Sequence, residues 1–106
     1  LISLSSTNVA YFYIHEKLVM VMTLTGKKMP IDESLDQLEK ELDKQGFFRV
    51  NRGMIINEKA IDKMIAYSRS RVKLELNPIF SEDVVVSRER TPLFKKWLVQ
   101  NDNFEQ

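Results

Sequence analysis

The stretch Phe-Phe-Arg-Val-Asn-Arg-Gly-Met-Ile-Ile-Asn, residues 47–57, decides how this chain folds. Apolar residues stand on both sides of its centre, so two short extended segments are predicted around a tight turn at 51–53. Later in the chain, Val-Ser-Arg at 86–88 again sets an arginine beside a short apolar run. A planar guanidinium on a rigid support is well suited to binding a guanine edge or a phosphate. Both segments are therefore candidate binding sites.

Strand patterns extend on both sides of this stretch. Residues 18–24 are apolar enough that we expect burial on both faces, whereas residues 72–76 alternate with polar side chains and predict a half-exposed strand. Residues 64–68 and 72–76 look like a hairpin across 69–71. Besides 48–50 and 54–56, the predicted strands cover residues 9–14, 18–24, 29–31, 64–68, 72–76 and 84–86.

Two amphipathic helices are predicted. The first follows Ser34, which can cap it with Gln37 at the capping-box position, and it ends at Gly46. The second begins near Pro92, because Thr91-Pro92 makes a good pair for the cap and first turn of a helix. The long run of strand patterns between the two helices excludes a helix-turn-helix motif.

Length and composition indicate one small globular domain spanning residues 1–106. The fold class that these patterns favour is mainly β (α+β), with short antiparallel strands in small packed sheets and two helices. The absence of cysteine excludes disulfides, thiolate catalysis and cysteine-based zinc sites. The apolar runs are far shorter than the roughly 18 residues that a membrane helix needs, so we expect a cytoplasmic protein with no membrane partner.

The net charge of +1 conceals an uneven distribution. Residues 1–48 hold five Lys/Arg against seven Asp/Glu, whereas residues 49–96 hold eleven against six. The basic excess thus lies in the region with the arginine-bearing segments. Such asymmetry favours a polyanionic partner, but charges scattered over a solvated surface explain it equally well.

No catalytic or metal-binding set accompanies these features, so we expect no enzyme, no cofactor and no metal. His15 is the only histidine and cannot build a histidine-rich metal site or a catalytic triad. The carboxylate pairs at 32–33 and 82–83 lie at a helix entrance and in a predicted turn, where neither needs a catalytic role. Three glycines do not form a phosphate-binding loop here.

Each candidate arginine also has an ordinary structural explanation. Arg49 lies in an extended segment, where a cross-strand ion pair with an acid such as Glu75 would account for it. Arg52 stands in a tight turn, where an ordinary solvated arginine is the commoner outcome for any single residue. Arg88 lies at the approach to a helix, where pairing with Glu89 or another acid would account for it. From the residues alone, these explanations stay open.

The ordered pieces FFRVNRGMIINEKAI and VVVSRER, followed by an apolar terminal helix, resemble the LytTR-type DNA-binding domain. The usual pattern there is close to F-x-R-x-H-R-S-x-x-V-N with a later V-S-R. The resemblance runs from about Val9 to Leu98 and includes the capped helix at 34–39. It implies a domain of small antiparallel sheets that binds duplex DNA through loops.

The resemblance also implies which residues contact DNA. Base contacts carry over to the loop His15 to Lys17, to Asn51 and Arg52, and to Arg88, and we expect Arg52 and Arg88 to enter a major groove. Asn51, where the family usually has His, would read an adenine edge or a phosphate, and Gly53 replaces the usual Ser. Arg49 and Asn57 match further motif positions that are structural or phosphate-facing. The candidates for sequence-independent phosphate contacts are Lys17, Arg49, Arg69, Arg71 and Lys95.

Such domains usually regulate transcription as the output half of bacterial two-component response regulators. The resemblance thus implies a preceding receiver domain, an upstream sensor histidine kinase, and homodimers on paired promoter repeats. The chain begins at Leu1 without Met, so we expect it to be a C-terminal piece of such a protein. The alternative is a β-rich protein-interaction or dimerisation module whose arginines meet an acidic protein surface.

Overall fold

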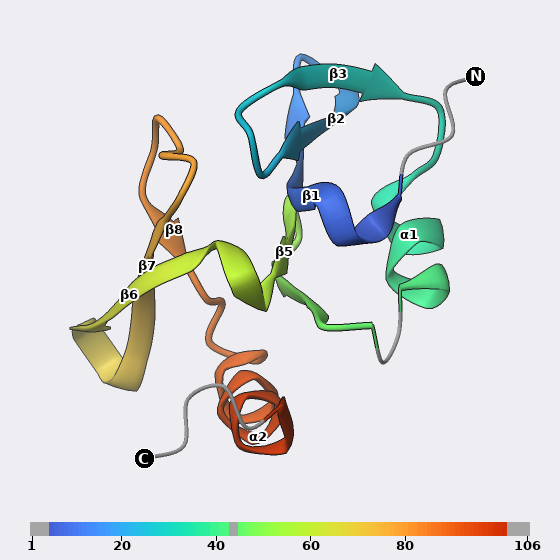
Figure 1. Cartoon of the computed structure of the whole chain (residues 1–106). Helices are drawn as coiled ribbons and strands as arrows, with labels where there is room; N and C mark the ends of the chain where they lie inside the picture. Colours follow the sequence, from blue (N-terminus) through green and yellow to red (C-terminus); the bar gives the residue numbers. More distant parts are fainter. Residues whose placement is uncertain (1–4, 43–44, 102–106) are drawn as a thin grey trace.

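A computed structural model describes residues 5–42 and 45–101 of the chain. Among these residues, eight strands form two antiparallel sheets, and two α-helices pack beside them (Figure 1). The predicted mainly β (α+β) class is therefore confirmed. In chain order the elements are β1 (Val9–His15), β2 (Leu18–Thr23), β3 (Lys28–Ile31), α1 (Leu35–Glu41), β4 (Phe47–Asn51), β5 (Met54–Asn57), β6 (Ile61–Tyr67), β7 (Arg71–Leu76), β8 (Val84–Val85) and α2 (Thr91–Asn101).

The five-stranded sheet has the order β3-β2-β1-β5-β4, and β1 lies at its centre. As predicted from residues 47–57, β4 and β5 pair antiparallel around the turn at 51–53, with a shift in register between Arg49 and Asn51. The prediction that residues 18–24 are buried on both faces is only partly right. Val21 and Met22 are buried, but Leu18 is 53% exposed because it lies opposite His15 beside an exposed hairpin turn.

The apolar runs of this sheet pack on both of its faces. Along β5, Met54 and Ile56 join one core cluster and Ile55 joins the other, because successive side chains of a strand point to opposite faces. One cluster includes side chains of α1, which lies beside this sheet (Figure 1). The other lies between this sheet, the second sheet and α2, and it includes Leu74 and Phe94. Two covered faces explain why β5 reads as a continuous apolar run.

Helix α1 begins where the sequence predicts and ends sooner. Ser34 Oγ accepts a hydrogen bond from the backbone N–H of Gln37 at 3.0 Å, which caps the first turn. The Gln37 side chain donates to Glu41 instead of returning to Ser34, so only half of a capping box forms. The last helical residue is Glu41; Gly46, with φ +83°, lies beyond it in the connection to β4.

The second sheet has the order β6-β7-β8 and contains the predicted hairpin. Arg69 and Ser70 at its tip have φ of 61° and 65°, in the left-handed region. Helix α2 begins at Thr91, next to the predicted Pro92, and Thr91 Oγ1 donates to the Ser87 carbonyl at 2.8 Å. No described helix is long and apolar enough to cross a membrane.

Tyr11 provides a test of how the core cluster joins the two sheets. Its buried hydroxyl donates to the Pro78 carbonyl at 3.0 Å, which ties β1 to the loop after β7. Burial, reinforced by the neighbouring Tyr13, raises the pKa of Tyr11 from 10.0 to about 12. Tyr11→Phe is expected to lower the free energy of unfolding at pH 7 by about 1 kcal/mol.

Because the folded-state pKa is raised, the stabilising effect of the neutral phenol is complete below pH 10 and is lost as the pH rises towards 12. Tyr11→Phe should lack this alkaline loss of stability. Urea unfolding at a series of pH values measures both effects. Tyr67→Phe is the matched control, because Tyr67 on β6 is 40% exposed, and this variant should behave like the wild type. Identical alkaline profiles for wild type and Tyr11→Phe would contradict this role of the phenol.

Candidate nucleic-acid interface

Three loops that the sequence singles out meet at one end of the five-stranded sheet. They are the β1–β2 turn at 16–17, the β4–β5 turn at 51–53, and the segment 86–90 that leads into α2. The backbone N–H of Ile14 donates to the Gly53 carbonyl at 3.3 Å, which joins the first loop to the second. The N–H of Ser87 donates to the Val50 carbonyl at 2.9 Å, which joins the third. The β1–β2 turn beside His15, the turn that carries Arg52 and the segment that carries Arg88 are thus neighbours.

Asn51 holds the β4–β5 turn in shape. Its side-chain oxygen accepts the N–H of Gly53 at 2.9 Å, and its side-chain nitrogen donates to the Val85 carbonyl at 3.1 Å. Both ends of the amide are therefore engaged inside the protein, and one of them ties this turn to β8. A half-buried Asn in this arrangement is a local turn-former of the kind that asparagine favours.

Arg52 and Arg88 are the exposed arginines of these loops. Within the described residues, neither guanidinium makes a hydrogen bond or ion pair. The pairing of Arg88 with Glu89 that the sequence allows is therefore not formed. An exposed guanidinium keeps all five of its N–H donors for a partner or for water.

Arg49 is held inside the protein, with only 11% of its side chain exposed. Its Nη1 donates to Asp36 at 2.5 Å and to Glu39 at 3.1 Å, and its Nη2 donates to the Arg52 carbonyl at 2.6 Å. The acids come from α1, and not from Glu75 as the cross-strand explanation expects. The hydrogen bond from Arg49, with its positive charge, holds the pKa of Asp36 below its usual range.

Asn57 is also internal. It is 4% exposed, and its side chain donates to the Val9 carbonyl at 2.8 Å and accepts the N–H of Lys59 at 3.0 Å. The amide thus satisfies backbone groups where β5 passes into a 3₁₀ turn at Glu58–Ala60. In this structure, the side chains of Arg49 and Asn57 are thus both engaged inside the protein.

The β1–β2 turn exposes Lys17 and the neighbouring His15. Glu16 and Lys17 both have positive φ, 52° and 69°, which makes a two-residue turn of the kind that usually contains Asn-Gly. Neither is Asn or Gly, so the backbone here is strained. His15 and Lys17 are exposed, and His15 Nε2 lies 3.6 Å from the Glu16 carboxylate.

A basic depression of about 270 Å³ lies between the tip of the β6–β7 hairpin and the start of α2. Its lining includes four cationic side chains and no acid: Arg69, Arg71, Arg88 and Lys95. The sequence identifies each of these as a candidate for contact with DNA, but it does not show that the hairpin tip and the helix lie together. Arg71 is positioned over the Tyr67 ring, with its guanidinium carbon 5.3 Å from the ring centroid.

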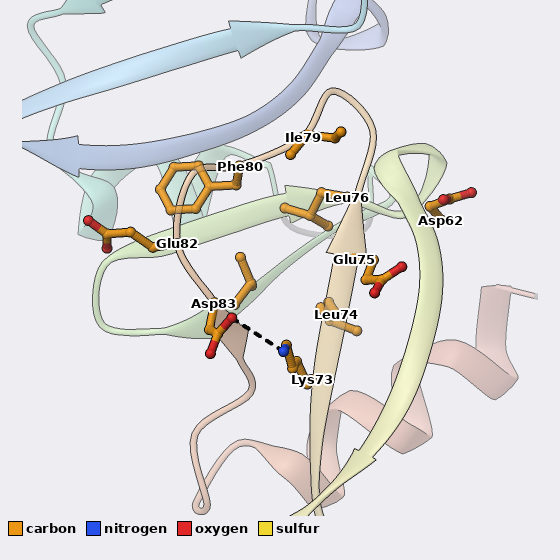
Figure 2. Close-up of a pocket in the computed structure, with 10 residues that line it drawn as sticks. Asp62, Lys73, Leu74, Glu75, Leu76, Ile79, Phe80, Glu82 and Asp83 are labelled. Carbon is orange, nitrogen blue, oxygen red and sulfur yellow. Dashed lines mark ion pairs between the residues drawn. The ribbon is translucent and has the colours of Figure 1, made fainter.

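An acidic depression lies at the other end of β7 (Figure 2). Four of its lining residues are carboxylates: Asp62, Glu75, Glu82 and Asp83. Figure 2 shows Asp83 paired with Lys73, at 3.3 Å. These carboxylates disfavour a polyanion. In the part of the chain that the structure describes, no three histidine, cysteine or carboxylate side chains are arranged so that they could hold a metal ion.

The chain is a small α+β domain that displays exposed basic side chains on its loops. The family model of the LytTr DNA-binding domain matches residues 1–99, and the chain belongs to this family. A similar solved structure is the LytTr DNA-binding domain of a protein described as a methyl-accepting/DNA response regulator from Bacillus cereus. The two are 26% identical, with a TM-score of 0.78 over 92% of this chain and 86% of that chain. No curated protein matches.

Family membership makes this a DNA-binding domain of transcription regulation. The resemblance to LytTR-type domains that the sequence predicts is therefore confirmed for the fold and for the general function.

Proposed function

We propose that the domain binds double-stranded DNA sequence-specifically, with Arg52 and Arg88 reading base edges in a major groove. The observation that carries this proposal is that two exposed arginines lie on neighbouring loops joined to the same sheet by hydrogen bonds. Among the described residues, neither guanidinium makes an internal hydrogen bond or ion pair. A guanidinium that contacts guanine in a bidentate manner contributes about 1–3 kcal/mol of base discrimination. His15, beside the β1–β2 turn, is the third base contact that we propose.

Sequence-independent affinity would come from phosphate contacts beside these loops. Lys17 lies on the β1–β2 turn, and the basic depression supplies the other cations, Arg69, Arg71 and Lys95. Asn51 contributes by shaping the turn that presents Arg52. Within a response regulator, we propose that the domain acts on paired promoter repeats as a homodimer, under the control of a receiver domain and its sensor kinase.

Selection of bound sequences from a random pool of duplexes tests this proposal directly. The selected duplex should bind more tightly than a scrambled duplex of the same composition, and binding should weaken steeply between about 50 and 200 mM salt. Failure to enrich any sequence would overturn the proposal. Binding to an acidic protein surface with no affinity for duplex DNA would favour a protein-interaction module instead.

Lys95→Ala separates phosphate contacts from base contacts within the same experiment. We expect it to lower the affinities for the selected and the scrambled duplex about equally. The slope of log affinity against log salt should decrease in magnitude by about one. Lys27→Ala is the matched control, because Lys27 lies in the β2–β3 turn, at the end of β2 remote from Lys17. A change in sequence preference on Lys95→Ala would contradict a pure phosphate role.

A further inference from the structure

Arg49, which the sequence suggests as a DNA contact, is better placed to hold the β4–β5 turn that carries Arg52. The Arg49 guanidinium donates to the backbone carbonyls of the turn that it precedes, from Nη2 to Arg52 at 2.6 Å and from Nε to Asn51 at 3.3 Å. Its remaining nitrogen is held by two carboxylates of α1. The Arg49 guanidinium thus binds two carbonyls of the turn and two carboxylates of α1, which fixes the position of the turn relative to this helix.

The same helix also reaches the loop of Arg88. Arg90 Nη1 lies 3.4 Å from Glu39 Oε2 and donates to the Arg49 carbonyl, also at 3.4 Å. The backbone N–H of Arg90 donates to the Ser87 carbonyl at 3.1 Å, within the segment that carries Arg88. The Glu39 carboxylate therefore bridges Arg49 of β4 and Arg90 of the segment before α2, with Oε1 on Arg49 and Oε2 on Arg90.

The carboxylates of this cluster partner the largely buried Arg49 charge, but their own charge does not favour DNA binding. Carboxylates beside a DNA-binding surface repel phosphates, so Asp36 and Glu39 weaken nonspecific attraction. Ion pairs with an exposed partner contribute little to stability, and Glu39 is 43% exposed and Asp36 83% exposed. The cluster instead fixes the positions of the turns, because a bidentate base contact requires the side chain that contacts the base to be held within about 0.5 Å.

We propose that Glu39, Arg49 and Arg90, which we call the arginine bridge, set the relative placement of the Arg52 and Arg88 turns and so determine sequence preference. All three are positioning residues, and α1 would control specificity without touching DNA. This inference rests on the proposed function, since it assigns the support of the same reading side chains.

Glu39→Gln tests the bridge, with Glu41→Gln as its matched control. Both changes remove one negative charge from α1, but Glu41 contacts Gln37 and, among the described residues, neither arginine of the bridge. We expect Glu39→Gln to lower the ratio of affinities for selected and scrambled duplexes by about tenfold, because the base contacts are misplaced. Glu41→Gln should leave this ratio unchanged.

Simple electrostatics predicts a different outcome for the same pair. Loss of a carboxylate beside a polyanion site should tighten the binding of both duplexes equally, in Glu39→Gln as in Glu41→Gln. The absolute affinity for the scrambled duplex reports this charge effect, while the ratio of affinities reports the positioning effect.

Arg49→Lys provides a second variant and a readout that needs no DNA. Lysine keeps the positive charge but cannot hold two carbonyls and two carboxylates at once. In the free protein, we expect a changed NMR amide signal and faster hydrogen exchange at Gly53, whose N–H is bonded to Asn51. Thermal unfolding confirms that each variant is folded before binding is measured.

The outcomes separate the two proposals. If the wild type prefers the selected duplex and Glu39→Gln retains that preference as fully as Glu41→Gln does, the bridge is overturned and the proposed function stands. If the wild type itself prefers no duplex, the proposed function fails and the positioning role fails with it. Loss of preference in both Glu39→Gln and Arg49→Lys, together with the altered Gly53 amide, supports the bridge.

Discussion

Arg52→Ala is expected to lower the preference for a selected duplex over a scrambled one by about 10- to 100-fold, with the fold intact. The guanidinium is exposed and makes no internal hydrogen bond or ion pair among the described residues, so its removal leaves no unsatisfied group in the core. The Arg52 carbonyl, which Arg49 holds, is backbone and remains. Competition binding against the scrambled duplex measures the loss of preference.

The position of the lost preference distinguishes reading from general attraction. Arg52→Ala should relax the selected sequence at one base position, and Arg88→Ala should relax it at another, because the two side chains project from different loops. Repeating the selection with each variant shows which positions have become indifferent. An unchanged footprint and an unchanged selected sequence for Arg52→Ala would exclude the role assigned to the β4–β5 turn.

Phe94→Ala is expected to lower the free energy of unfolding by about 3–5 kcal/mol, the typical cost of emptying a fully buried aromatic site. Phe94 is 0% exposed and packs against Phe48 of β4 and Trp97 of its own helix, with ring centroids 5.5 and 5.7 Å apart. These contacts hold α2 on the five-stranded sheet. Urea unfolding followed by tryptophan fluorescence measures the change.

Leu93→Ala is the matched control for this helix, since Leu93 is the preceding residue and is 58% exposed. We expect it to cost less than about 1 kcal/mol. Equal costs for the two variants would show that α2 does not pack through Phe94. A further expected effect of Phe94→Ala is weaker binding of the selected duplex, because α2 follows directly on the segment that carries Arg88.

Much of the fold is readable from the sequence, because local patterns determine it. The period-two alternation of 72–76 and the continuous apolar run at 54–56 identify β7 and β5, and Ser34 marks the start of α1. These signals are local: a strand period, a cap and a turn each need only a few neighbouring residues. The family pattern at 47–57 adds the arrangement of the pieces.

The partners of polar side chains are not readable in this way. Arg49, Asn57 and Asn51 look alike as polar residues next to apolar runs, yet they are engaged within the protein. Besides a partner nearby in the chain, each has one from a distant part of it: α1 for Arg49, β1 for Asn57, and β8 for Asn51. Tertiary packing decides which polar group faces inward, and no local spacing records it.

The shape of the basic site has the same origin. Arg69 and Arg71 lie on a hairpin tip, and Arg88 and Lys95 lie around the start of α2. Composition marks all four as cationic, but only the docking of the hairpin against the helix brings them to one depression.

Strand β7 runs from a cation-lined hollow at Arg71 to a carboxylate-lined one at Glu75 and Leu76. The domain therefore has an electric polarity along this strand. In the electric field of a DNA double helix, the domain experiences a torque that turns its cationic end toward the DNA before contact. Fewer collisions then arrive in an unproductive orientation, and added salt should remove this advantage by shortening the distance over which the field acts.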